Sequence, residues 1–163
     1  MNIIGTIKET FADGPGIRYA IYCAGCRHAC KGCHNPQSWD FNQGASLDKA
    51  LPIIIKEIKA NPMLTGITIS GGDPFYSREG LLLLLKTLKK EFPDKDVWVY
   101  TGFTLEQLDA LHEQQTYDCL ELIDVLVDGK YIEALRDTTD FKGSTNQRII
   151  ENPIKKIEKS SLL

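Results

Sequence analysis

Cys26-Arg27-His28-Ala29-Cys30-Lys31-Gly32-Cys33, followed by His34-Asn35-Pro36, is the stretch around which this chain must fold. Its C-x3-C-x2-C spacing lets a short loop turn three sulfurs toward one bound object. Thiolates gathered this closely are typical ligands of a soft metal ion or an iron–sulfur cluster. Three thiolates would leave one iron of a four-iron cluster without a protein ligand, and an open position marks a catalytic metal site. We therefore expect this loop to carry chemistry.

Other interpretations of the same cysteines remain open on the loop alone. Cys23 extends the run to C-x2-C-x3-C-x2-C, which matches a structural zinc site with four thiolates. Disulfides would require an oxidising compartment. The opening residues Met1-Asn2-Ile3-Ile4 show no basic segment and no long apolar stretch, so no signal peptide is evident. We expect a cytoplasmic protein with reduced thiols, which argues against disulfides.

Composition indicates an ordinary globular chain. With 163 residues, of which 42% are hydrophobic and 25% charged, the chain is expected to form one domain over residues 1–163. A net charge of −3 and a pI of about 5.6 do not favour nucleic acid or an anionic membrane as partner. The longest apolar run, residues 81–85, is too short to span a bilayer.

Strand-like and helix-like segments alternate along the chain. Strands are predicted at residues 17–22, 66–70, 97–100 and 123–127, with a weaker edge-strand signal at 148–150. Apolar spacing predicts helices over 51–58, 81–88 and 105–111, with Ser77 and Thr104 as N-caps and Pro52 as an early residue or a kink. This order predicts an α/β fold with right-handed βαβ units and a mostly parallel sheet. Periodicity does not distinguish an open sheet from part of a barrel.

Polar turns follow the predicted strands. They are Gly71-Gly72-Asp73, Thr101-Gly102 and Asp128-Gly129-Lys130, and the cysteine loop follows a strand in the same sense. The carboxyl ends of parallel strands form the edge where α/β proteins place their ligands. We therefore expect these four segments to converge on one rim.

Five motifs together resemble the radical S-adenosylmethionine superfamily, and within it the activating proteins of anaerobic ribonucleoside-triphosphate reductases. They are DGPGIR at 13–18, the cysteine loop ending in Cys33-His34-Asn35-Pro36, SGGDP at 70–74, DVLVDGK at 124–130 and GSTNQR at 143–148. The resemblance covers essentially the whole chain. It implies a compact partial (β/α) barrel and favours a cluster over zinc.

What the resemblance implies about chemistry is specific. Cys26, Cys30 and Cys33 would each bind one iron of a [4Fe–4S] cluster, and S-adenosylmethionine would bind the fourth. One electron from the cluster would cleave this cofactor to methionine and a 5′-deoxyadenosyl radical, which removes hydrogen from a glycine of the large subunit of the reductase. A flavodoxin-type protein would supply the electron. The alternatives are activation of another glycyl radical enzyme, a small-molecule substrate and, more distantly, a structural zinc-binding module.

The same resemblance implies the residues that bind the cofactor: Gly32, Cys33, His34, Ser70, Gly71, Gly72, Asp73, Asp128 and Lys130. Glycines at 71 and 72 would let backbone carbonyls approach the ammonium group of the cofactor. Ser70 and Asp73 would contact its methionyl end, and His34 would lie near its adenine. Asp128 and Lys130 would hold the ribose or the carboxylate, although a solvated loop is a plainer interpretation of that pair.

Several residues near these motifs have secondary roles or none that the sequence reveals. Arg27 and Lys31 are interpreted either as charges that lower the pKa values of nearby thiols and offset the charge of the cluster, or as ordinary solvated charges. Cys23 receives no iron in the family pattern, and Cys119 is interpreted as a packing residue in a helix-to-strand connection. The 143–148 motif has no derivable role; it could touch the nucleotide end of the cofactor or the reductase.

Overall fold

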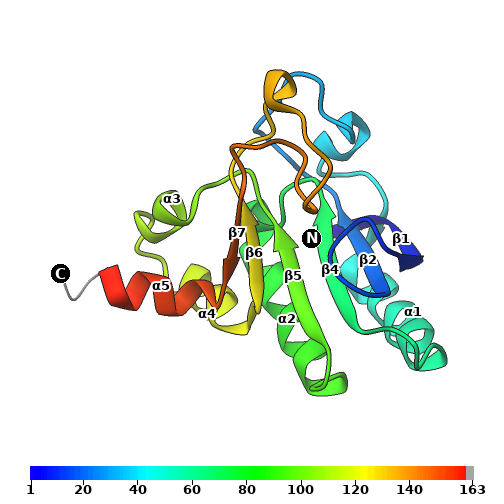
Figure 1. Cartoon of the computed structure of the whole chain (residues 1–163). Helices are drawn as coiled ribbons and strands as arrows, with labels where there is room; N and C mark the ends of the chain where they lie inside the picture. The colour runs from blue at the N-terminus through cyan, green and yellow to red at the C-terminus, as the bar shows by residue number, and fades with distance from the viewer. Residues whose placement is uncertain (161–163) are drawn as a thin grey trace.

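A seven-stranded mixed sheet forms the centre of the computed structural model, which describes residues 1–160 (Figure 1). The strands are β1 (Asn2–Thr10), β2 (Arg18–Cys23), β3 (Ala45–Ser46), β4 (Gly66–Gly71), β5 (Asp96–Tyr100), β6 (Val125–Asp128) and β7 (Arg148–Glu151), in the order β3-β1-β2-β4-β5-β6-β7. Strands β2, β4, β5 and β6 are parallel, whereas β1, β3 and β7 join antiparallel. The predicted α/β fold with a mostly parallel central sheet is confirmed.

Helices cover one face of this sheet. They are α1 (Leu47–Ala60), α2 (Arg78–Glu91), α3 (Leu105–Asp109), α4 (Gln114–Leu122) and α5 (Pro153–Ser160), with short 3-10 turns η1 (Pro36–Trp39), η2 (Pro74–Ser77) and η3 (Glu133–Leu135). In Figure 1, α2 and α4 lie behind the central strands. The predicted apolar face of α2 is fully buried and consists of Leu81, Leu84, Leu85 and Leu88. It packs against every second residue of the strands, such as Ile21, Ile67 and Val99.

The other face of the sheet is covered differently. Because side chains alternate along a strand, it carries polar and aromatic residues such as Tyr22, Ser70 and Tyr100. Within residues 1–160 it is met by the connection between β6 and β7, drawn in orange in Figure 1, rather than by a helix. Phe141 of this connection packs on Trp98 with ring centroids 6.0 Å apart, and its carbonyl accepts a 2.6 Å hydrogen bond from the Tyr100 hydroxyl. Within residues 1–160, this helix-free face therefore leaves the central strands open to a ligand.

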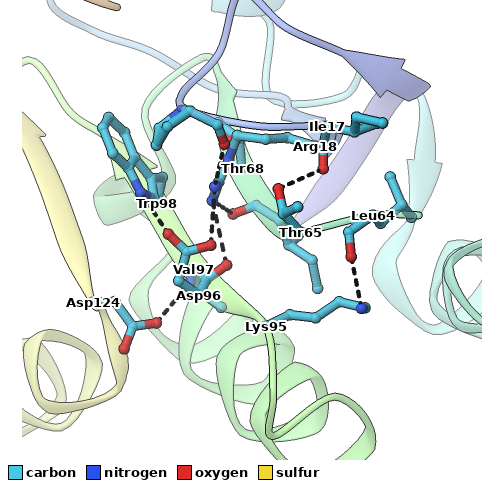
Figure 2. A network of polar contacts seen from close by, with 12 residues as sticks. Ile17, Arg18, Leu64, Thr65, Thr68, Lys95, Asp96, Val97, Trp98 and Asp124 are labelled. Carbon is cyan, nitrogen blue, oxygen red and sulfur yellow. Dashed lines mark hydrogen bonds and ion pairs between the residues drawn. The ribbon is translucent and has the colours of Figure 1, made fainter. Parts of the chain in front are cut away.

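Arg18 is a buried cation at the start of β2 and is 1% exposed (Figure 2). Its guanidinium forms an ion pair with Asp96 at 2.9 Å and donates to the hydroxyl of Thr68 at 2.8 Å and to the carbonyl of Ile67 at 2.9 Å. It also lies 5.3 Å from the centre of the Trp98 ring. Since these partners belong to β4 and β5, one side chain fastens the amino ends of three parallel strands.

The same network holds the Asp13-Gly14-Pro15-Gly16 turn. The carbonyl of Asp13 accepts from Thr68 at 2.7 Å, and that of Pro15 accepts from Arg18 at 3.3 Å. Gly14 has a φ of +133°, and a Cβ there would lie 2.7 Å from Cδ of Arg18. The turn and the arginine of this motif therefore form one structural unit.

The sequence missed or misplaced several elements. Strand β1 and helix α5 were not predicted, and Cys119 lies inside α4 rather than in a connection. Helix α1 begins at Leu47, so Pro52 lies within it; Pro52 is on the exposed side, where water can satisfy the carbonyl that loses its N–H partner. Ser77 stands at the N-cap of α2 without a side-chain cap bond, whereas the capping box of Thr104 and Gln107 is confirmed. Across residues 1–160, each helix is too short or too polar to cross a membrane.

We expect Arg18→Met to lower the free energy of unfolding by about 3 kcal/mol, because the buried acceptors of β4 and β5 lose their hydrogen-bond donor. Anaerobic urea unfolding with the thiols reduced measures the change. Lys8→Ala is the control, since Lys8 is 72% exposed in its ion pair with Glu57, and it should shift stability by under about 0.5 kcal/mol. Equal effects of the two substitutions would contradict this role of Arg18.

Candidate functional site

The cysteine loop and the carboxyl ends of the parallel strands enclose a cavity of about 740 Å³ on the helix-free face. Its lining includes Cys26, Cys30, Cys33, His34, Ser70, Gly71, Gly72, Asp73, Thr101 and Gly102, together with Tyr131 and Phe141 of the β6–β7 connection. Figure 1 shows the cysteine loop and this connection side by side above the strands. The predicted convergence of strand ends is confirmed, and the volume suits a cofactor-sized molecule.

Strand register brings the loop and the glycine turn together. In the parallel pairing of β2 with β4, Tyr22 lies opposite Ser70 and Cys23 opposite Gly71. The chain then leaves β2 directly into the loop. The start of the loop is held by η1, because Gly25 N–H donates to the carbonyl of Ser38 at 2.7 Å.

Backbone groups beside the loop stabilise its sulfurs. The N–H of Asn35 donates to the sulfur of Cys33 at 3.4 Å, and backbone hydrogen bonds from His28 and Tyr131 act to lower the pKa values of Cys26 and Cys30. All three cysteines are partly exposed and line the cavity. Hydrogen bonds of this kind to thiolate ligands orient them and tune the potential of a cluster.

The expectation that Arg27 and Lys31 depress thiol pKa values is wrong for two of the cysteines. Burial raises the pKa of Cys26 to about 11, and burial also raises the pKa of Cys30. Arg27 instead lies over the ring of Phe41 at 5.4 Å. Loss of hydration at the sulfurs outweighs the charges of the exposed loop side chains.

Cys23 is not available to complete a four-thiolate site. It is fully buried on the helix-covered face, with its Sγ 3.9 Å from the sulfur of Met1, and burial raises its pKa to about 12. Throughout residues 1–160, no group of three His, Cys, Asp or Glu side chains is arranged to hold a single metal ion. The burial of Cys23 argues against a zinc site of four thiolates.

Asp73 is the polar centre of the site and is 1% exposed. Its carboxylate accepts from Phe75 N–H at 3.0 Å, from the Thr101 hydroxyl at 2.9 Å and from Gly102 N–H at 2.9 Å. His28 of the cysteine loop reaches the same carboxylate at 2.6 Å. Because both oxygens accept hydrogen bonds within the protein, Asp73 joins the loop to β4 and β5. It also lines the cavity, and its contact with the cofactor stays a prediction.

The glycine pair is packed tightly beneath the loop. Gly71 has a φ of +101°, and a Cβ at Gly72 would lie 2.6 Å from the carbonyl oxygen of Gly25. Gly72 N–H donates to the carbonyl of Cys23 at 2.7 Å, and Asp73 N–H donates to that of Gly25 at 2.9 Å. Close backbone packing within the protein therefore requires glycine at positions 71 and 72. Close approach of a ligand would be a second reason for glycine there.

Three predicted cofactor residues do not line the cavity. Asp128 is 1% exposed; it accepts from Leu105 N–H at 2.7 Å at the start of α3 and pairs with Arg148 at 2.5 Å. Lys130 is exposed, although its charge lowers the pKa of Cys30. Gly32 is also exposed, and a Cβ there would meet the carboxyl group of Glu133 at 2.6 Å.

The 143–148 motif has a structural role that sequence reasoning missed. The Gln147 side chain accepts from Gly143 N–H at 2.8 Å and donates to the carbonyl of Gly129 at 2.8 Å. Asn146 donates to the carbonyl of Lys130 at 2.8 Å. The motif therefore holds the β6–β7 connection against the end of β6. Gly143 and Gln147 of the motif line the cavity. Its unusual density of amide and hydroxyl side chains was the available signal.

Comparison with known proteins bears on this geometry. Residues 12–150 match the family model described as a 4Fe-4S single cluster domain. The chain is 40% identical to the anaerobic ribonucleoside-triphosphate reductase-activating protein of Haemophilus influenzae, over 91% of this chain and 97% of that protein. It is 38% identical to the protein of the same name from Escherichia coli K12, over 83% and 88% of the two chains. The phage T4 protein of that name is 33% identical over 87% and 88%.

The chain belongs to the family of anaerobic ribonucleoside-triphosphate reductase-activating proteins. As a member of this family with a single-cluster domain, it carries its three loop cysteines within the matched region. The resemblance stated from the five motifs is confirmed. The cysteine loop and the glycine turn line one cavity, which lies at the carboxyl edge of the sheet.

We expect Gly72→Ala to push the cysteine loop away from β4, because its methyl group would overlap the carbonyl of Gly25. The free energy of unfolding should fall by about 2 kcal/mol, and iron retention should fall with it. Anaerobic unfolding and iron analysis measure both. Gly5→Ala is the control, since a Cβ there meets nothing within 4 Å. Normal stability and iron content in Gly72→Ala would contradict the packing role.

Proposed function

We propose that the cavity holds a [4Fe–4S] cluster on Cys26, Cys30 and Cys33 together with S-adenosylmethionine, and that the chain activates anaerobic ribonucleotide reductase. One observation carries the proposal: three partly exposed cysteines and a glycine turn line one cavity. Three ligands suit a cluster with one open iron, since the fourth nearby cysteine is buried elsewhere.

The lining residues fit the cofactor as well. Backbone carbonyls at Gly71 and Gly72 are suited to its ammonium group, and Ser70 adds a hydroxyl. His34 packs against Tyr131 with ring centroids 5.0 Å apart, which offers aromatic surface for an adenine. We assign the direct contacts to these residues and supporting roles to Asp73, Asp128, Lys130 and Gly32.

Held by Cys26, Cys30 and Cys33, a reduced cluster would supply the electron for reductive cleavage of S-adenosylmethionine, and so the radical chemistry that removes a hydrogen atom from a glycine of the reductase. The residues of this chain position the reactants and keep water away from them. The β6–β7 connection covers part of the cavity with Phe141, and Tyr100 and Tyr22 have their hydroxyls tied to Phe141 and Asp13. A dry, fixed site is what radical chemistry requires.

A protein substrate fits the cavity mouth better than a small molecule does. Ile7 and Phe11 line the cavity and remain 44% and 69% exposed. Apolar side chains left exposed at the rim of a site are typical of an interaction surface. We therefore propose that the reductase large subunit covers this side. Activation of a different glycyl radical enzyme is the second candidate, because the same rim would serve it.

The finer expectations follow from the same proposal. We propose one domain over residues 1–163, supported by a main hydrophobic cluster that reaches from Ile3 to Ile157. We also propose a partial (β/α) barrel whose inner side is the cavity. A flavodoxin-type donor would meet the outer side of the loop, where Arg27 and Lys31 are exposed. The five free cysteines fit a cytoplasmic location, where thiols stay reduced.

The ligand assignment predicts which cysteines matter. Cys26→Ala, Cys30→Ala and Cys33→Ala should each lose the stable four-iron cluster, because a remaining pair of thiolates cannot hold it. Iron and sulfide analysis after anaerobic reconstitution measures this. Cys119→Ala and Cys23→Ala are matched controls and should keep four irons per chain. A full cluster in Cys30→Ala would overturn the assignment.

The activity is tested anaerobically with the reconstituted and reduced protein. Adding S-adenosylmethionine should change the electron paramagnetic resonance of the cluster and release 5′-deoxyadenosine. With the reductase present, a glycyl doublet should appear, and flavodoxin should replace chemical reductant as electron source. Cofactor cleavage without a glycyl signal on the reductase would favour a different substrate. A protein that binds zinc and never cleaves the cofactor would overturn the proposal.

A further inference from the structure

We propose that His28 is a positioning residue that sets the distance between the cysteine loop and the glycine turn of β4, and thereby the placement of S-adenosylmethionine on the cluster. The proposal rests on the proposed function. It concerns a residue between two cluster ligands that is itself no ligand.

His28 is buried in a loop that is otherwise open to solvent. Its side chain is 6% exposed, whereas its neighbours Arg27 and Ala29 are exposed. Its Nε2 lies 2.6 Å from the carboxylate of Asp73. Burying a polar side chain is costly unless it is hydrogen-bonded. The contact with Asp73 therefore offsets the cost of burying the His28 ring.

The ring is held from three sides. It packs edge-on against Phe103 with centroids 4.6 Å apart and lies 5.2 Å from the ring of Tyr76. A Cβ at Gly102 would collide with the imidazole, so the glycine after β5 leaves the space that the ring fills. The imidazole therefore has little freedom to turn away from Asp73.

His28 acts on a cluster ligand and on the cofactor turn at once. It lies two residues after the ligand Cys26 and two residues before the ligand Cys30, while its ring binds Asp73, the residue that follows the glycine pair. Backbone bonds join this turn to residues 23 and 25, which precede the ligands. The His28–Asp73 contact is a side-chain link that starts between two of the ligands, so it fixes how far the sulfurs stand from Gly71 and Gly72.

The test compares His28→Phe with His28→Gln in the full, reconstituted chain. His28→Phe keeps a ring between Tyr76 and Phe103 but removes the donor to Asp73, whereas the glutamine amide can supply an N–H. Arg27→Ala is the matched control, because it alters the adjacent exposed residue of the same loop. Iron content, thermal melting and the affinity for S-adenosylmethionine are measured, the last by titrating the resonance of the reduced cluster.

We expect His28→Phe to keep four irons and to melt at a modestly lower temperature, because the buried Asp73 carboxylate loses one donor. It should bind S-adenosylmethionine at least tenfold more weakly, with an altered resonance of the bound form. His28→Gln should recover affinity to within about threefold of the wild type, a rescue that reflects the hydrogen bond. Arg27→Ala should match the wild type in iron content, melting temperature and affinity for S-adenosylmethionine, because none of these measurements involves the donor protein.

Two outcomes overturn the proposal. One is wild-type affinity and resonance in His28→Phe, which would leave the ring with a packing role. The other is loss of iron in both variants, which would make His28 a requirement for forming the loop rather than for placing the cofactor. Failure of the proposed function is distinguishable, because the wild-type cluster would then not respond to S-adenosylmethionine at all.

Discussion

The buried carboxylate of Asp73 is the interaction on which the site depends. Removing a charge from water is costly unless donors surround it, and this one receives them from the ends of β4 and β5 and from the cysteine loop. The Gly-Gly-Asp-Pro turn, the Thr-Gly turn and the histidine between the cysteines are therefore one structural unit. Hydrogen bonds to Asp73 hold these three segments in place relative to one another.

A second buried charge, Arg18, stabilises the opposite end of the same strands. The helix-covered face consists of aliphatic side chains, so both charges depend on partners at the strand ends and on the polar face. The result is a rigid parallel sheet with a fastened amino end and a carboxyl edge that carries the ligands. Catalytic groups placed on such an edge keep their mutual distances, which a reaction with a reactive radical requires.

The chain leaves one side of its cavity to other molecules. No helix within residues 1–160 covers that face, and the β6–β7 connection closes only part of it, with exposed Ile7 and Phe11 beside the remaining opening. An activating protein whose substrate is another protein gains from this arrangement. The partner can enter the site as a segment of chain and complete the exclusion of water at the same moment.

Local signals in the sequence determined the strands β2, β4, β5 and β6, the leucine face of α2, the capping box of Thr104 and the three cysteines at the strand edge. These follow from periodicity, capping and ligand spacing, which act over a few residues. Only the tertiary structure decided that Asp128 pairs with Arg148, that Cys23 faces the core, and that Asp73 binds His28, 45 residues away. A polar side chain can satisfy its hydrogen bonds with any donor brought within reach, so its partner depends on how strands far apart in sequence are placed side by side.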